Sequence, residues 1–154
     1  VNIMENNEYM ALALELARQA GEAGEVPVGC VIVWDGRIVG RGRNRREKNK
    51  NALAHAELEA IHDACRTLGG WRLWKARLYV TLEPCPMCAG AILNARIPEV
   101  FFGARDSSMG ACGGVVNLFE EGFRPRPKLT GGILEEPCLA LLQKFFQDLR
   151  TKSP

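Results

Sequence analysis

A strand that turns directly into a helix is indicated by residues 78–88, Leu78-Tyr79-Val80-Thr81-Leu82-Glu83-Pro84-Cys85-Pro86-Met87-Cys88. The stretch 78–82 is mostly apolar and predicts a short buried strand. Pro86 suits the first turn of a helix, where its missing N–H costs nothing. This helix is expected to end near Arg96, before Ile97-Pro98. The two cysteines therefore lie where a strand meets a helix, at one edge of a sheet.

The residues before this stretch predict a helix, a hairpin and a second helix. Apolar residues recur at helical spacing between Met10 and Ala20, and Gly21 and Gly24 close that helix. A β-branched run over 28–34 predicts a buried strand. Asp35-Gly36 suits a tight turn, and 37–42 returns as the partner strand. A second helix is expected over about 55–68.

The residues after it continue the alternation of strands and helices. Val100 to Gly103 predicts a strand, and 107–114 predicts a glycine-rich loop. The last helix has a strong apolar stripe, made of Leu134, Cys138, Leu141, Leu142, Phe145 and Leu149. We therefore expect a layered α/β domain with right-handed crossovers and locally parallel strands.

Length and composition fit one soluble domain over residues 1–154. The chain is 47% hydrophobic and 25% charged, as in ordinary globular proteins. No apolar run approaches the roughly 20 residues that span a bilayer. The segment Val1-Asn2-Ile3-Met4-Glu5 lacks the basic and apolar regions of a secretory signal. These features predict a cytosolic protein and argue against a disulfide framework for its six cysteines.

Cys85 and Cys88 have the spacing of metal ligands, because the first turn of a helix can direct both sulfurs the same way. Cys30, Cys65 and Cys138 fit buried core positions, and the role of Cys112 stays open. The dipole at a helix N-terminus lowers thiol pKa values and so favours thiolate ligands.

One histidine completes a set of three ligands, and three protein ligands are typical of catalytic zinc. The chain contains two histidines, His55 and His62. His55 begins a predicted helix in the motif His55-Ala56-Glu57. His62 lies two helical turns further on, about 10 Å along the axis, and is interpreted as a surface or packing residue. We therefore predict one zinc ion bound by His55, Cys85 and Cys88.

Glu57 follows the predicted histidine ligand by two positions, which lets its carboxylate reach a water at the metal without binding the metal. Such a group can carry protons from the water to a ring nitrogen and then to a departing amine. Glu59 points roughly 200° further round the helix and Glu83 precedes Pro84 at a strand end, so both are expected to be structural. The H-x-E and P-C-x-x-C pair is the pattern of zinc deaminases.

Basic residues are concentrated in ten positions, and they are Arg41, Arg43, Arg45, Arg46, Lys48 and Lys50. A charge run of this kind is often only a solvated loop. It also fits a strip that contacts the phosphates of a nucleic acid.

Over nearly its whole length the chain resembles the bacterial-type tRNA-specific adenosine deaminases of the cytidine and deoxycytidylate deaminase superfamily. The matching segments include 25–29 (Glu-Val-Pro-Val-Gly), 42–44, 54–57, 79–91, 102–106 and the helix over 141–146. The zinc motif itself is shared with cytosine and guanine deaminases, so the flanking segments carry the specificity of the resemblance.

The resemblance implies a cytidine-deaminase-like three-layer α-β-α fold, with a five-stranded mixed sheet and helices on both faces, assembled as a homodimer. It implies conversion of the wobble adenosine of a tRNA anticodon to inosine by hydrolytic attack at C6. By position, Asn44 would hydrogen-bond the flipped base, and Val26, Pro84 and the backbone of Ala56 would line its pocket. Arg105 and Asp106 would approach the neighbouring nucleotides.

The chain departs from the family at Phe123-Arg124-Pro125-Arg126-Pro127, where an Asn-His-Arg stretch is usual. Two alternatives therefore stay open. One is a deaminase of a free base or nucleotide, such as guanine or deoxycytidylate. The other is a zinc-stabilised RNA-binding module without catalysis, with Cys112 as a fourth ligand. Glu57 argues against the module, since a closed structural site has no use for a carboxylate beside it.

Overall fold

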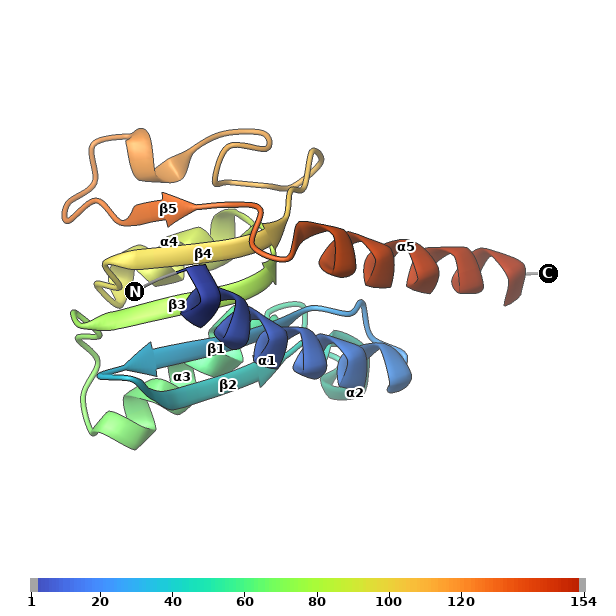
Figure 1. The fold of residues 1–154 in the computed structure, drawn as a ribbon, viewed down its shortest axis with the longest axis horizontal. Coiled ribbons are helices and arrows are strands. Elements are labelled where there is room, and N and C mark those ends of the chain that lie inside the picture. Colours follow the sequence, from blue (N-terminus) through green and yellow to red (C-terminus); the bar gives the residue numbers. More distant parts are fainter. Residues whose placement is uncertain (1–2, 153–154) are drawn as a thin grey trace.

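The computed structural model describes residues 3–152 (Figure 1). Val1, Asn2, Ser153 and Pro154 lie outside the described residues, and with them the ends of the predicted 1–154 domain and part of the assessed N-terminal segment. In chain order the helices and strands are α1 (Ile3–Glu22), β1 (Gly29–Trp34), β2 (Arg37–Arg43), α2 (Arg46–Asn49), α3 (Ala56–Leu68), β3 (Ala76–Leu82), α4 (Pro86–Asn94), β4 (Glu99–Ala104), the 3-10 helix η1 (Leu118–Glu120), β5 (Lys128–Thr130) and α5 (Glu135–Lys152). The elements predicted from the sequence are present within a few residues. Three elements have no counterpart among the predicted ranges, and they are α2, a short helix inside the basic segment, the 3-10 helix η1 and the short strand β5.

The five strands form one mixed sheet in the order β2-β1-β3-β4-β5. The expected locally parallel strands are β3, β4 and β5, whereas β1 is antiparallel to both of its neighbours, which makes the sheet mixed. The structure also contains the predicted β1–β2 hairpin. Asp35 and Gly36 have φ values of 51° and 72°, the left-handed pair that a two-residue turn between antiparallel strands requires.

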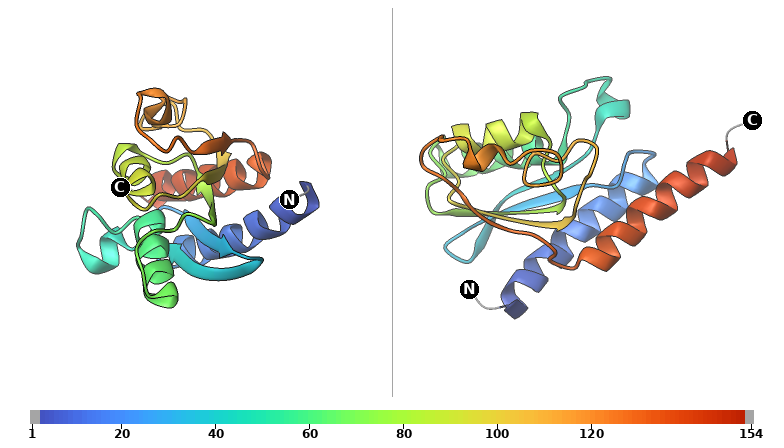
Figure 2. Two further views of the ribbon diagram at one scale, coloured as in Figure 1. Left: turned by 90° about the vertical axis from the view of Figure 1, so that its left-hand side faces the viewer. Right: turned by 90° about the horizontal axis from the view of Figure 1, so that it is seen from above.

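Helices cover both faces of the sheet, which confirms the three-layer architecture. In the right view of Figure 2, α1 and α5 lie side by side on one face, with α3 and α4 on the other. Strands β1, β3 and β4 are buried almost throughout, as expected for strands between two helical layers. None of the helices in residues 3–152 is long and apolar enough to cross a membrane.

Two glycines of β2 bring the sheet into close contact with α3. A Cβ added to Gly40 would lie 2.3 Å from the carbonyl oxygen of Ala60, and one added to Gly42 would lie 2.1 Å from that of Ala56. Any side chain there would push α3 away from the sheet. This contact therefore fixes the start of α3, where the predicted histidine ligand lies.

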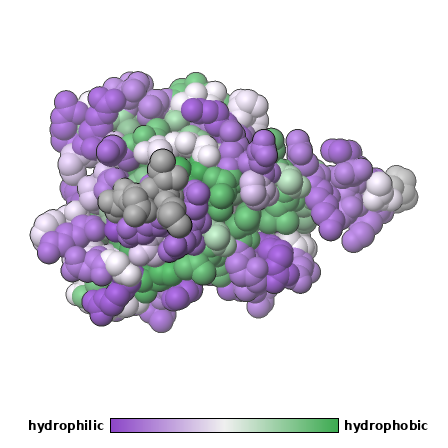
Figure 3. All heavy atoms as spheres, viewed as in Figure 1, coloured by the Kyte–Doolittle hydropathy of each residue, from purple (hydrophilic) through white to green (hydrophobic). Residues whose placement is uncertain are grey.

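Helix α5 extends beyond the sheet (Figure 1) and has two apolar faces instead of one stripe. Cys138 and Leu142 are buried, whereas Leu139 and Phe146 are each 42% exposed. On the face drawn in Figure 3, hydrophobic surface gathers where α5 leaves the sheet, and hydrophilic surface surrounds it. The exposed pair borders a cavity at the carboxyl ends of β3 and β4.

Candidate active site

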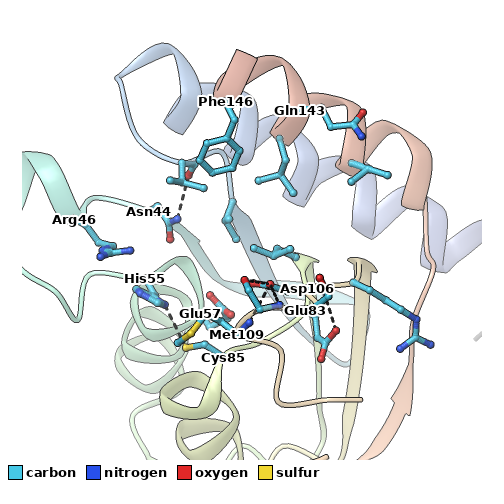
Figure 4. Close-up of a pocket in the computed structure, with 18 of the residues that line it drawn as sticks. Asn44, Arg46, His55, Glu57, Glu83, Cys85, Asp106, Met109, Gln143 and Phe146 are labelled. Atoms are coloured by element: carbon cyan, nitrogen blue, oxygen red, sulfur yellow. Dashed lines mark hydrogen bonds between the residues drawn. The ribbon is translucent and has the colours of Figure 1, made fainter. Parts of the chain in front are cut away.

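The three predicted metal ligands meet at the N-terminal ends of α3 and α4. His55 is the N-cap residue of α3, Cys85 is that of α4, and Cys88 lies one turn into α4. The His55 Nδ1 atom lies 3.6 Å from the Cys85 Sγ (Figure 4) and 3.5 Å from the Cys88 Sγ. All three donor atoms lie within 4.8 Å of one another.

These distances fit zinc. With Zn–N bonds of about 2.05 Å and Zn–S bonds of about 2.3 Å, a tetrahedral angle separates nitrogen from sulfur by about 3.6 Å. The two observed separations match that value. Two sulfurs and one imidazole nitrogen are also a donor set that zinc prefers. The side chains are therefore arranged as three corners of a tetrahedron, and the fourth corner has no protein ligand in this cluster.

Cys112 does not join the cluster, contrary to the alternative in which it is a fourth ligand. Its side chain is buried, and its backbone N–H donates to Glu83 Oε2 at 2.9 Å. Burial raises the pKa of the Cys112 thiol to about 12, which disfavours the thiolate that a metal requires. The geometry thus describes an open, three-ligand site and not a closed structural one.

Cys85 favours the thiolate form, the form that binds a metal cation, even when no metal is present. A hydrogen bond from Cys88, with a further one from His55, lowers the pKa of Cys85 to about 4, although partial burial opposes this. The pKa of Cys88 is raised, first by its hydrogen bond to Cys85 and then by burial. Without metal, the Cys85 thiolate accepts a hydrogen bond from the Cys88 thiol. A dication beside both sulfurs would favour the thiolate form of each.

Glu57 lies next to this cluster, on the first turn of α3, and is only 4% exposed. Burial raises the pKa of its carboxyl to about 7, with hydrogen bonds and the nearby His55 opposing that shift. A carboxyl group with this pKa can both accept and release a proton near neutral pH. Its position toward the cavity is visible in Figure 4.

The cluster forms one end of a cavity of about 720 Å³. The lining residues that the sequence predicted are Val26, Asn44, His55, Glu57, Cys85, Arg105 and Asp106. Ala56 and Pro84 do not line it. They act through backbone atoms beside it, because the Ala56 N–H and the Pro84 carbonyl hydrogen-bond Asn44 and Ala111 respectively.

Asn44 joins the two sides of the cavity mouth. Its Oδ1 accepts a hydrogen bond from the Ala56 N–H at 3.0 Å, and its Nδ2 donates to the Val26 carbonyl at 3.1 Å. The first bond satisfies an N–H at the start of α3 that no N-cap side chain serves. A side-chain amide can make about four hydrogen bonds, so one N–H and one oxygen lone pair stay available toward the cavity.

Glu83 organises the loop that closes one side of the cavity. Its buried carboxylate accepts hydrogen bonds from the backbone N–H groups of Asp106, Cys112 and Gly114. A Cβ at Gly110 would lie 2.2 Å from Glu83 Oε2, so the glycines let the loop wrap around this carboxylate. This arrangement agrees with the structural role expected for Glu83. Glu59 forms an ion pair with Arg45, which agrees with the structural role expected for Glu59.

Arg105 and Asp106 begin the same loop. The Arg105 guanidinium lies over the Phe102 ring, 5.6 Å from its centre. Asp106 Oδ1 accepts bonds from the Ser108 N–H, the Ser108 hydroxyl and the Met109 N–H. Burial alone would raise the pKa of Asp106, but these hydrogen bonds outweigh it and lower the pKa. Asp106 also borders the cavity.

The basic segment is not one continuous strip. Arg45 is bound to Glu59 with a separation of 2.7 Å, and Arg43 reaches toward Gln19 on α1. Arg46 borders the cavity, as Figure 4 shows. It is held there by α2, whose first N–H groups, from Glu47 and Lys48, donate to the buried Glu25 carboxylate.

Sequence reasoning missed the part of the cavity that α5 supplies. Leu139, Leu142, Gln143, Phe146 and Arg150 recur at helical spacing along one face of α5 and line the cavity. That periodicity is readable in the sequence, but the predicted apolar stripe contains only Leu142 of these five residues. Three of the residues that line the cavity are arginines, and they are Arg46, Arg105 and Arg150.

Residues 4–104 match the family profile described as the cytidine and deoxycytidylate deaminase zinc-binding region. Together with the mixed sheet and the His/Cys/Cys cluster, this match defines the class: the chain belongs to the cytidine and deoxycytidylate deaminase family and has its zinc-binding region.

Three relatives place the chain more narrowly. The tRNA-specific adenosine deaminase of Bacillus subtilis is 48% identical over 145 residues, which cover 94% of this chain and 90% of that protein. A solved structure described in studies of A-to-I editing by tRNA:A34 deaminases has a TM-score of 0.85 and 44% identity, covering 88% of this chain and 99% of that one. A guanine deaminase from Bacillus subtilis has a TM-score of 0.61 and 42% identity, covering 64% of this chain and 63% of that one.

Proposed function

We propose that this chain is a zinc-dependent deaminase that converts adenosine to inosine at the wobble position of a tRNA anticodon. One observation carries the proposal: a His/Cys/Cys cluster beside the buried Glu57 lies in a cavity bordered by Arg46, Arg105 and Arg150. The cluster supplies the chemistry of deamination, and the arginines suit a substrate that extends beyond one base into a phosphate backbone.

The reaction replaces the amino group at C6 with oxygen and releases ammonia. When bound, zinc makes a water molecule nucleophilic near neutral pH. Glu57 takes one proton from the attacking water as the C–O bond forms, and passes it to the adjacent ring nitrogen. It then takes the remaining proton from the hydroxyl group at C6 and passes it to the amino group as the C–N bond breaks and the C6 carbonyl forms. The buried position of Glu57 keeps bulk water from competing for these protons.

The substrate base must leave its stack to reach Glu57, and an anticodon loop permits this at small cost. Asn44 is positioned to hydrogen-bond the flipped base with the amide groups that its own contacts leave over. Val26 offers apolar contact to the same base, and the backbone at Ala56 and Pro84 supports the pocket wall. Arg105 and Asp106, at the start of the adjacent loop, are placed to contact the flanking nucleotides.

The rival function is deamination of a free base such as guanine, and the chemistry at the cluster would be the same. The length of the cavity favours the polynucleotide. It extends from Glu57 to Gln143 and Arg150 on α5, with Phe146 offering an aromatic face between. A single base would fill only the part near Glu57.

The test is to incubate the zinc-loaded protein with total tRNA and to sequence the anticodons for inosine. We expect inosine at the first anticodon position and no ammonia release from guanine or deoxycytidylate. Ammonia from either small substrate, with no inosine in tRNA, would overturn the proposal in favour of its rival.

Charge reversal at the cavity rim is expected to weaken tRNA binding and leave the chemistry intact. Arg46→Glu should raise KM for tRNA at least about tenfold at low salt and flatten its salt dependence, because each lost phosphate contact removes about 0.7–0.9 from the log–log salt slope. The maximal rate should stay within a few-fold of the parent. Lys144→Glu is the matched control, since Lys144 lies on the other side of α5, facing α1. Superimposable salt curves for the parent and Arg46→Glu would contradict the phosphate contact.

We also propose a homodimer, as the resemblance implied. The apolar sequences of α4 and of residues 115–119 make these two segments the candidate contact surfaces. Of these, Val115 and Val116 are exposed, whereas Phe119 is buried in the core and offers no surface. Light scattering at micromolar concentration should give about twice the 17.0 kDa chain mass. Val115→Asp with Val116→Asp should shift it toward one chain mass, whereas a single-chain mass for the parent would exclude the dimer.

The cytoplasm is the compartment that we propose for this activity. All six cysteines are free, and two of them are positioned to bind metal. Free thiols of this kind persist in a reducing compartment.

A further inference from the structure

All three tryptophans of the chain lie together at the end of the sheet opposite the cavity. Trp34 ends β1, and Trp71 and Trp74 precede β3. The Trp34 and Trp74 rings meet edge to face with their centres 6.0 Å apart. This segment is at the left-hand end of the sheet in Figure 1 and faces the viewer in the left view of Figure 2. The seven residues of β3 separate it from the cavity by about 20 Å.

Two of these indoles are unusually exposed for their size. Trp71 is 48% exposed and Trp74 is 59% exposed. They are also firmly held, because Leu73 between them is fully buried and its N–H donates to the Ala95 carbonyl at 2.8 Å. Their exposure is therefore built into an anchored turn.

Cations are stacked on both exposed rings. The Arg72 guanidinium lies 4.2 Å from the centre of the Trp71 ring, with that of Arg96 at 5.7 Å from the same ring. The Lys75 ammonium lies 4.8 Å from the Trp74 ring. Residues 66–77 contain four basic side chains and no acidic one. The acids near this end of the sheet are Asp35, which follows Trp34, Glu5, which pairs with Arg77 at 3.5 Å, and the half-buried Glu99, opposite Arg77 in register.

Anchored indole rings with arginine and lysine side chains stacked on them fit one class of partner. Aromatic rings stack on unpaired bases, and interleaved arginine and lysine side chains neutralise the phosphates between them. We propose that the tryptophan surface (Trp34, Trp71, Trp74, Arg72, Lys75 and Arg96) binds single-stranded RNA by base stacking, separately from the catalytic cavity. It would give the protein a second RNA contact beyond the anticodon loop that the cavity accepts.

The intrinsic fluorescence of the protein reports this surface directly. None of the residues that line the cavity is a tryptophan, so every indole in the chain belongs to the tryptophan surface. Titrating the zinc-loaded protein with a single-stranded uridine oligonucleotide should quench the fluorescence. The affinity should fall as salt rises, with a slope of about −0.7 per phosphate contact. Double-stranded RNA and polyglutamate are the comparison ligands.

Two variants test the stacking and the charge separately. Trp71→Ala with Trp74→Ala should weaken binding of a dye-labelled oligonucleotide about tenfold or more, as loss of stacking predicts. Phe123→Ala removes an exposed aromatic ring in the loop before β5 that is not part of the tryptophan surface, and it should change the affinity less than twofold. Arg72→Gln with Lys75→Gln should reduce the salt slope by about 1.4. This variant keeps the indoles and decides the question if the double alanine variant does not fold.

Absence of quenching at low salt would overturn the proposal, as would equal quenching by polyglutamate or double-stranded RNA. Failure here is distinguishable from failure of the proposed function. The tryptophan variants should still form inosine in a minimal anticodon hairpin, because they leave the residues of the catalytic cavity unchanged. Inosine formation without oligonucleotide quenching would refute only the tryptophan surface.

Discussion

Replacing Glu57 with glutamine should reduce deamination by at least about 10² to 10⁴-fold, the contribution typical of a general acid–base group. The effect is expected near the upper end of this range because the Glu57 carboxyl carries both protons of the reaction, one to the ring nitrogen and one to the amino group. Glutamine has nearly the same shape and cannot accept or release a proton at neutral pH. It therefore tests proton transfer without opening a cavity beside the metal ligands.

Zinc content and RNA binding should be nearly unchanged in Glu57→Gln, since Glu57 is not among the three clustered ligand atoms. The matched control is Glu59→Gln, which changes an acid on the same helix that pairs with Arg45 and does not line the cavity. Its turnover should stay within a few-fold of the parent. Single-turnover measurements with saturating protein isolate the chemical step. Glu57→Gln turnover within a few-fold of the parent would remove Glu57 from the mechanism.

The sequence was sufficient for the metal cluster because the ligands follow from local rules. Cys85 and Cys88 share one helical turn, and His55 begins a helix that the apolar pattern of residues 56–64 already marks. What brings the two helix starts together is longer in range. Gly40 and Gly42 set the distance of α3 from the sheet, and this contact becomes visible only when the strand and the helix are placed together.

The parts that the sequence did not predict depend on pairings between distant residues. The strand order puts β1 between β2 and β3, so a helix that follows β2 leads to a strand two positions away. The sequence does not predict this order. Glu25 is buried because it satisfies the N–H groups of Glu47 and Lys48 in α2, which lie 22 and 23 residues further along the chain. No periodicity in either segment encodes that contact.

Helix α5 is a second case in which the sequence pattern does not predict what its side chains contact. Its apolar residues satisfy a simple amphipathic pattern, and a single core-facing stripe is the simplest interpretation of it. In the structure Cys138 is buried in the core, Leu142 is buried and also lines the cavity, and Leu139 and Phe146 line the cavity while partly exposed. Hydrophobicity reports that a side chain avoids water. It does not distinguish a permanent core contact from a surface that a substrate covers.

The metal site predicts opposite outcomes for two buried cysteines. Cys88→Ala should remove zinc and abolish turnover, because two remaining ligands hold zinc poorly and the tetrahedral arrangement needs its third corner. Cys112→Ala should keep about one zinc per chain and most of the activity, since Cys112 lies outside the cluster. It should still lower the free energy of unfolding by about 1 kcal/mol, because its thiol fills space in the core.

Metal content per chain and thermal unfolding with and without a chelator separate these outcomes. A ligand that binds only the folded state raises its stability, so chelation should lower the Tm of the parent and of Cys112→Ala. The Tm of Cys88→Ala should not respond to the chelator, because that variant has no zinc to lose. Zinc loss in Cys112→Ala would instead restore the four-ligand structural site, and with it the interpretation of the chain as an RNA-binding module. Retention of zinc by Cys88→Ala would show that Cys88 is not a zinc ligand. The 3.5 Å separation between the Cys88 Sγ and the His55 Nδ1 would then be only a packing contact.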